Sequence, residues 1–266
     1  MPATSLFQAA AEALKATDPT AKCEAAQALA QDLEAGGVSA TGRPVAVDVP
    51  GLPERPELVH PRSVPRRKLS TAEGHAALIH AVTHIEFSAI NLALDAAARF
   101  GGMPREYYAD WVRVAAEEAE HFKLISGHLK TLGRSYGDFP AHAGLWEAAA
   151  KTADDPLKRM ALVPRVMEAR GLDVTPDMIG RLRGIGDEAG ARILERILAD
   201  EIGHVAIGSR WFGHLCEARG LDPETTFQGL ISAELGGLRA GECNREARLA
   251  AGFSEAELAS LFPTCA

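Results

Sequence analysis

Two stretches, Glu117-Glu118-Ala119-Glu120-His121 and Asp200-Glu201-Ile202-Gly203-His204, share one pattern: a glutamate followed three residues later by a histidine. Residues three apart lie on the same face of a helix, so each pair presents a carboxylate and an imidazole in one direction. Both pairs also lie on apolar stripes, formed by Trp111, Val114 and Ile125 around the first pair and by Leu194, Ile197 and Trp211 around the second. The pattern therefore predicts two buried polar pairs on two helices.

Two further glutamates, Glu86 and Glu168, precede these pairs in alternating order, at intervals of 32 and 33 residues from Glu118 and Glu201. A charge on a buried stripe is costly unless it is paired or bound to a metal. The order Glu, Glu-x-x-His, Glu, Glu-x-x-His is the ligand set of a dinuclear carboxylate site in a four-helix bundle. The predicted metal ligands are Glu86, Glu118, His121, Glu168, Glu201 and His204.

The chemistry of these ligands indicates two iron ions, with manganese as the alternative, because both metals accept carboxylate oxygens together with imidazole nitrogens. Four glutamates balance the four positive charges of two divalent ions. Glu117 and Asp200 directly precede the two pairs. They either accept the second ring N–H of a ligating histidine on a neighbouring helix, or they are surface charges.

Helix-forming residues and helix boundary signals predict an all-α fold. Long helices are expected over residues 70–100, 104–132 and 187–219, with a further helical stretch over 156–171 that Pro164 kinks or breaks, and a short helix from Pro176 to about Arg183. The connection over residues 133–155 is long enough to cross a bundle. The predicted fold is a ferritin-like four-helix bundle with one long crossover.

The predicted division of the chain has three parts. Residues 1–69 hold N-terminal helices and a proline-rich segment, residues 70–219 form the metal-binding bundle, and residues 220–266 form a C-terminal helical extension. Six prolines between residues 38 and 69 exclude a continuous helix there. Interleaved valines and leucines favour a segment that wraps the domain over the alternative, a flexible linker.

The amino-acid composition limits the classes of binding partner and the cellular location that we expect. A net charge of −8 over 266 residues disfavours nucleic-acid binding, which needs a basic surface. The sequence shows no signal-peptide pattern and no run of 18 apolar residues, so neither secretion nor a membrane span is expected. The four cysteines match no metal or redox spacing and are expected to be isolated thiols. These features together predict a cytoplasmic protein.

Two further stretches, residues 167–176 and 244–253, resemble an uncharacterised bacterial family of ferritin-like proteins, known mainly as a domain of unknown function. The six predicted ligands look like those of the di-iron carboxylate superfamily to which that family is assigned. The resemblance covers residues 5 to 262. It implies the ferritin-like fold and the dinuclear site, and it does not specify a reaction.

The leading functional hypothesis is an oxidoreductase that activates O₂ or peroxide at two metal ions and hydroxylates a small organic substrate. Such a reaction needs an external electron donor, because the sequence encodes no flavin or iron–sulfur module. The sequence specifies neither this donor nor the oligomeric state. Two alternatives remain: a ferroxidase or peroxide-protective protein that handles metal, and a ferritin-like binding protein without catalysis.

Overall fold

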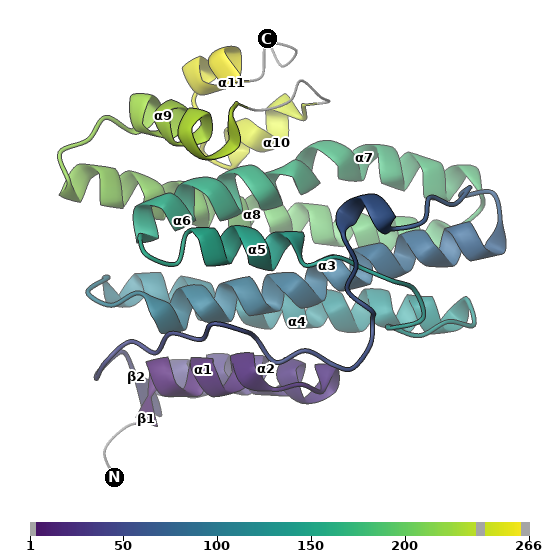
Figure 1. Ribbon diagram of the computed structural model, residues 1–266, viewed down its shortest axis with the longest axis horizontal. Coiled ribbons are helices and arrows are strands. Elements are labelled where there is room, and N and C mark those ends of the chain that lie inside the picture. The colour runs from purple at the N-terminus through teal and green to yellow at the C-terminus, as the bar shows by residue number, and fades with distance from the viewer. Residues whose placement is uncertain (1–3, 238–242, 262–266) are drawn as a thin grey trace. The chain divides into compact units, whose positions relative to one another are not determined.

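The computed structural model describes residues 4–237 and 243–261 (Figure 1). The chain divides into two compact units, Met1–Ala150 and Lys151–Ala266, and each is described by itself. Apart from two strands of two residues each, the regular structure of the described part is helical, which confirms the predicted all-α class. The predicted division of the chain into three parts, with boundaries at residues 69/70 and 219/220, stays a prediction.

Unit 1 contains two long helices, two shorter N-terminal helices and a wrapping segment. Its elements are β1 (Thr4–Ser5), α1 (Leu6–Lys15), α2 (Pro19–Glu34), β2 (Val38–Ser39), η1 (Pro61–Ser63), α3 (Ala72–Arg99), α4 (Arg105–Thr131) and α5 (Gly144–Lys151), all but the last residue of which belongs to this unit. The strands pair in parallel, with Thr4 opposite Val38. Helices α3 and α4 pack along each other, and α1 and α2 cover them.

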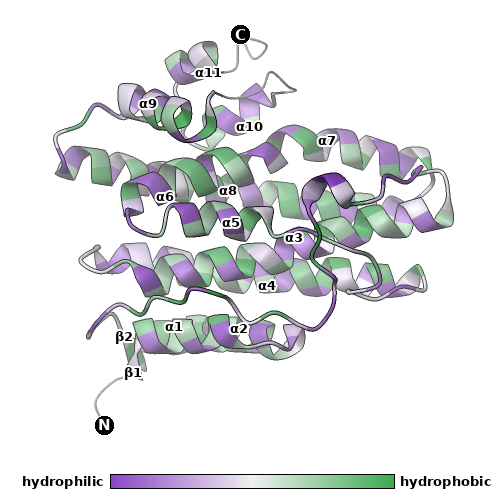
Figure 2. Cartoon of the chain, in the orientation of Figure 1, coloured by the Kyte–Doolittle hydropathy of each residue, from purple (hydrophilic) through white to green (hydrophobic). Residues whose placement is uncertain are grey.

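The helix boundaries follow from capping. The side chain of Asp18 accepts a hydrogen bond from the backbone N–H of Ala21 at 2.8 Å, which satisfies one of the first N–H groups of α2. Thr71 does the same for α3 through the N–H of Gly74 at 3.0 Å. In Figure 2, apolar and polar residues alternate along α4, as expected for a helix with one buried face.

The proline-rich segment wraps unit 1, as its interleaved valines and leucines predict, and is not a flexible linker. Its backbone N–H groups donate to three separate parts of the unit: Val45 to Ala98 at 2.8 Å, Gly51 to Leu14 at 2.9 Å and Val59 to Ala141 at 2.8 Å. Gly51 approaches α1 so closely that a Cβ atom would lie 2.1 Å from the carbonyl oxygen of Lys15. Only glycine fits at this crossing.

A buried lysine joins three parts of unit 1. Lys22 of α2 is fully buried, and its Nζ donates to the carbonyl oxygens of Leu14 and Gly51, each at 2.8 Å. It also donates to Oδ1 of Asn91 in α3 at 2.5 Å. Burial lowers the pKa of this ammonium group to about 7. Three acceptors from α1, the wrapping segment and α3 compensate its removal from water.

Replacing this lysine is expected to destabilise the protein. The substitution Lys22→Met keeps the apolar stem but leaves buried acceptors without a donor, so we expect the free energy of unfolding to fall by about 3 kcal/mol. Urea denaturation followed by circular dichroism measures this change. The control is Lys15→Met at an exposed position of α1. Equal stabilities of the two variants would show that the buried hydrogen bonds contribute nothing.

Unit 2 is also helical. Its elements are α6 (Pro156–Leu162), a π-helical segment η2 (Val163–Glu168), α7 (Ala169–Gly184), α8 (Glu188–Ala218), α9 (Pro223–Leu235), α10 (Arg245–Ala250) and α11 (Glu255–Leu261). The segment η2 contains Pro164, so the predicted irregularity at this proline is confirmed as a π-turn.

The predicted separate helix from Pro176 is wrong, because α7 continues through this proline. A proline in a helix leaves the carbonyl four residues earlier without its N–H partner. Here that carbonyl belongs to Leu172, and it accepts a hydrogen bond from Nδ2 of Asn244 at 3.2 Å. The C-terminal extension therefore supplies the hydrogen bond that Pro176 cannot donate.

Two expectations from composition can be compared with the described residues. Among them, α3 has the length and composition of a membrane span, but 72% of the relevant window is buried inside the structure, as in the core helix of a soluble protein. Cys23 and Cys216 are buried thiols, as expected. The expectation of isolated thiols is wrong for Cys243, which is disulfide-bonded. Cys265 lies outside the described residues.

Candidate metal centre

Glu86 is buried in the middle of α3. Its side chain is 3% exposed, and the residues one turn before and after it, Val82 and Ile90, are buried as well. The carboxylate therefore lies on a face that otherwise carries apolar side chains. Such a position is unfavourable for an ionised group unless a cation or a hydrogen-bond donor compensates it.

Helix α4 contributes Glu118 and His121, which are each 1% exposed. Buried Ala115 and Ile125 continue the same face of the helix above and below them. The spacing of three residues places both polar groups on that face, as the sequence predicts.

The three side chains converge. Nδ1 of His121 lies 3.2 Å from Oε2 of Glu118 and 3.4 Å from Oε2 of Glu86. Potential ligand atoms of the three residues all lie within 4.8 Å of one another. Ligand atoms that share one metal ion, with bonds of about 2.1 Å, lie about 3–3.5 Å apart. Unit 1 therefore contains a half-site of two carboxylates and one imidazole that fits a metal ion.

The half-site has a strong electrostatic preference for a cation. Burial by itself disfavours the charged form of His121, but hydrogen bonds and charge interactions with Glu118 and Glu86 outweigh it and raise the pKa of His121 to about 11. The imidazole thus holds a proton between two carboxylates. A divalent ion would supply more positive charge at the same place, and the donor set is one that iron and manganese accept.

Unit 2 carries the second set of predicted ligands. On α8, His204 is buried and its Nδ1 lies 3.7 Å from Oε2 of Glu201. Glu201 is partly buried, with 14% of its side chain exposed. Glu168 is the last residue of η2 and is also partly buried.

Contacts within unit 2 place Glu168 level with the pair on α8. Pro164 of η2 packs on Gly208 of α8, where a Cβ atom would lie only 2.4 Å from the proline ring. Helices α7 and α8 are joined by a short turn and therefore run antiparallel. Glu168 lies four residues after Pro164, and His204 lies four residues before Gly208. The contact between Pro164 and Gly208 thus places Glu168 and His204 at a similar height along the two helices.

The two residues predicted to support the histidines make contacts on their own helices. Oε1 of Glu117 lies 4.0 Å from Nε of Arg113, and Oδ2 of Asp200 lies 3.6 Å from Nε of Arg196. Their side chains are 42% and 37% exposed. These contacts are those of the surface-charge alternative, and the supporting role of Glu117 and Asp200 stays a prediction.

Sequence reasoning did not single out Tyr136, an aromatic residue that packs on α3 and α4. Tyr136 lies in the connection after α4, and its hydroxyl is 2.9 Å from Nδ1 of His84. Its ring packs against Phe87 and Phe122, the residues that directly follow Glu86 and His121. The signal that could have indicated it is an isolated tyrosine in a glycine-punctuated connection, which is too common to be specific.

Tyr136 also lines a small cavity of about 240 Å³. It is lined by residues 52–54 and 56–58 of the wrapping segment together with His84 and Tyr136. Because His84 and Glu86 are two residues apart, they lie on opposite sides of α3. The cavity is therefore separate from the half-site.

Sequence comparisons give the family. The family model described as "Protein of unknown function (DUF455)" matches residues 15–259. The chain belongs to the DUF455 family. An "Uncharacterized protein" of Haemophilus influenzae is 46% identical to it over 267 residues, which cover 96% of this chain and 93% of the relative. No solved structure matches the chain. Membership of DUF455 confirms the predicted family of unknown function.

Proton competition at His121 predicts a pH dependence of metal binding. At pH 7 the imidazole is protonated in the metal-free protein, because its pKa is about 11. A metal ion binds neutral imidazole and must displace this proton. We therefore expect the affinity for Mn²⁺ to rise with pH between 6.5 and 8.5, by up to about tenfold per pH unit for each proton released. Calorimetric titration at several pH values measures it, and a constant affinity would contradict this account.

Proposed function

We propose that this DUF455 protein binds two iron or manganese ions and uses them to activate O₂ or peroxide. The observation that carries the proposal is the buried half-site of Glu86, Glu118 and His121, whose potential ligand atoms lie within 4.8 Å of one another. Glu168, Glu201 and His204 of unit 2 supply an equivalent set of two carboxylates and one imidazole. Together the two sets provide the six ligands of a dinuclear carboxylate site.

The fold that we propose for this site is a ferritin-like four-helix bundle. Its helices are α3, α4, the α6–η2–α7 stretch and α8. The order of ligands along the chain supports it, since each half of the chain supplies one lone glutamate and one Glu-x-x-His pair. The intervals between the glutamates of each half, 32 and 33 residues, are nearly equal, as expected for two similar halves.

When bound, the ions supply the redox equivalents for reduction of O₂ or peroxide. The protein contributes neutralisation, orientation and exclusion of water. Four glutamates balance the charge of two divalent ions, so no further ion is needed in the interior. The apolar neighbours of Glu86 and Glu118 keep the half-site of unit 1 away from bulk water, which strengthens electrostatic interactions there.

The proposed reaction is the oxidation of a small organic substrate, with electrons from an external donor. The acidic net charge of −8 supports a small molecule over a nucleic acid. Oxidation of the metal without turnover of any organic compound would instead identify a ferroxidase or peroxide-protective protein.

Metal titration tests the proposal directly. Purified protein titrated anaerobically with Fe²⁺ is expected to bind two ions per chain, and exposure of the loaded protein to O₂ or peroxide is expected to consume the oxidant. Glu118→Gln removes a ligand while keeping its size, so we expect it to bind fewer than two ions. Glu106→Gln, at an exposed position of the same helix, is the matched control.

Three results would decide against the proposal. In the first, the wild-type protein takes up neither iron nor manganese. In the second, the Glu118→Gln variant retains two ions. In the third, the metal-loaded protein consumes neither O₂ nor peroxide. The first result would indicate a binding protein without a metal.

A further inference from the structure

Two arginines of unit 2 are buried to an unusual degree. Arg165 in η2 and Arg248 in α10 are each 2% exposed, although arginine is rarely buried without a partner. Arg165 lies three residues before Glu168 in the sequence, and Arg248 contacts the carbonyl of Ala169, the residue after Glu168. A buried ion pair is often no more stabilising than a well-packed apolar pair. What the ion pair adds is a fixed direction, since a guanidinium and a carboxylate meet in a defined geometry.

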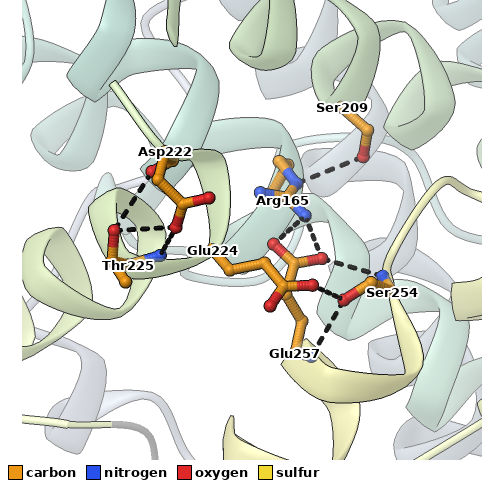
Figure 3. Close-up of polar contacts among 7 residues, drawn as sticks. All are labelled: Arg165, Ser209, Asp222, Glu224, Thr225, Ser254 and Glu257. Carbon is orange, nitrogen blue, oxygen red and sulfur yellow. Dashed lines mark hydrogen bonds and ion pairs between the residues drawn. The ribbon is translucent and has the colours of Figure 1, made fainter. Parts of the chain in front are cut away.

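Arg165 joins η2 to the C-terminal helix α11. Its Nη2 donates to both carboxylate oxygens of Glu257 at 2.8 Å, and its Nε donates to Oγ of Ser209 in α8 at 3.2 Å (Figure 3). Glu257 is itself held, because Oε2 accepts from the backbone N–H of Ser254 at 2.9 Å. The hydroxyl of Ser254 in turn donates to Oε1 of Glu224 in α9 at 2.5 Å.

Aromatic rings enclose the guanidinium of Arg165. The centres of Phe227, Phe253 and Phe212 lie 4.0, 4.6 and 4.9 Å from its Cζ. These rings exclude water and contribute cation–π attraction. The arginine therefore has a single well-defined position, set by α8, α9 and α11 together.

Arg248 joins the start of α7 to α10. Its Nε and Nη2 donate to the two carboxylate oxygens of Asp173 at 2.9 and 2.6 Å. Nη2 also lies 3.5 Å from the carbonyl oxygen of Ala169, the residue directly after Glu168. The backbone N–H of Asn244 donates to Asp173 at 3.0 Å as well.

We propose that the C-terminal helices act as a clamp that positions Glu168 for metal binding, with Arg165–Glu257 and Arg248–Asp173 as its two ion pairs. The first pair holds the chain three residues before Glu168, and the second holds the first turns of α7 after it. Glu168 is the last residue of a π-helical segment, a rare interruption of an α-helix that is frequent at functional sites. Arg165 and Arg248 are positioning residues that act through Glu168. This inference rests on the proposed function of the site.

The test removes one ion pair without leaving a buried charge. In the double variant Arg165→Met with Glu257→Gln, both charges are gone, while the glutamine can still accept from Ser254. The control is Arg219→Met with Asp155→Asn, which removes a more exposed bidentate pair of the same unit with distances of 2.7 and 3.0 Å. Thermal unfolding by circular dichroism confirms that both variants fold.

Hydrogen exchange of the metal-free proteins reports on the clamp itself. We expect faster exchange of amides 163–173 in the Arg165/Glu257 variant than in wild type or control. Titration with Co²⁺ reports on its consequence: we expect the affinity of one ion to fall by about 10- to 100-fold, with a changed visible absorption spectrum, because supporting residues orient ligands.

The outcomes separate the clamp from the proposed function. A folded variant with unchanged exchange at residues 163–173, or with the Co²⁺ affinities and spectrum of wild type, overturns the clamp even if the wild-type protein binds two ions. Wild-type protein that binds no Co²⁺, Fe²⁺ or Mn²⁺ overturns the proposed function and, with it, the positioning of Glu168 for a metal.

Discussion

Compensation of two buried carboxylates is the constraint on which the candidate site depends. Glu86 and Glu118 lie on apolar faces of α3 and α4, and the imidazole of His121 lies within 3.4 Å of an oxygen of each. In an interior of low dielectric this cluster favours positive charge strongly, which is why the pKa of His121 rises to about 11. A proton satisfies part of that preference. A divalent cation with oxygen and nitrogen ligands would satisfy it better. This preference is the physical link between the packing of the two helices and the redox function that we propose.

The remainder of each unit can be understood as support for these helices. In unit 1, the hydrogen bonds of Lys22 join α2 to α1, to the wrapping segment and to α3, the helix that carries Glu86. In unit 2, the short C-terminal helices make polar contacts on both sides of Glu168. The carbonyl of Leu172 illustrates their role, because it lacks a helical partner at Pro176 and obtains one from Asn244. Regions outside the four long helical stretches therefore maintain the irregular backbone that carries a predicted ligand.

Periodicity explains why part of the site could be predicted from the sequence. The burial of Glu118 and His121 follows from their place on an apolar stripe, and the irregularity at Pro164 follows from its missing N–H. Neither the continuity of α7 nor the contacts of Arg165 could be predicted in this way. Both depend on partners far along the chain: Arg165 and Glu257 are 92 positions apart. The contacts of Tyr136 could not be predicted for a similar reason, because a tyrosine in a connection between helices has no periodic pattern that indicates its neighbours.

The central claim concerns the identity and position of two cations, and anomalous X-ray scattering tests it most directly. Crystals of protein purified from its own host would be measured above and below the iron and manganese absorption edges. We predict two anomalous peaks, each bound by residues from the set Glu86, Glu118, His121, Glu168, Glu201 and His204. Maps without a peak at these residues, or with the metal bound elsewhere on the chain, would contradict the account.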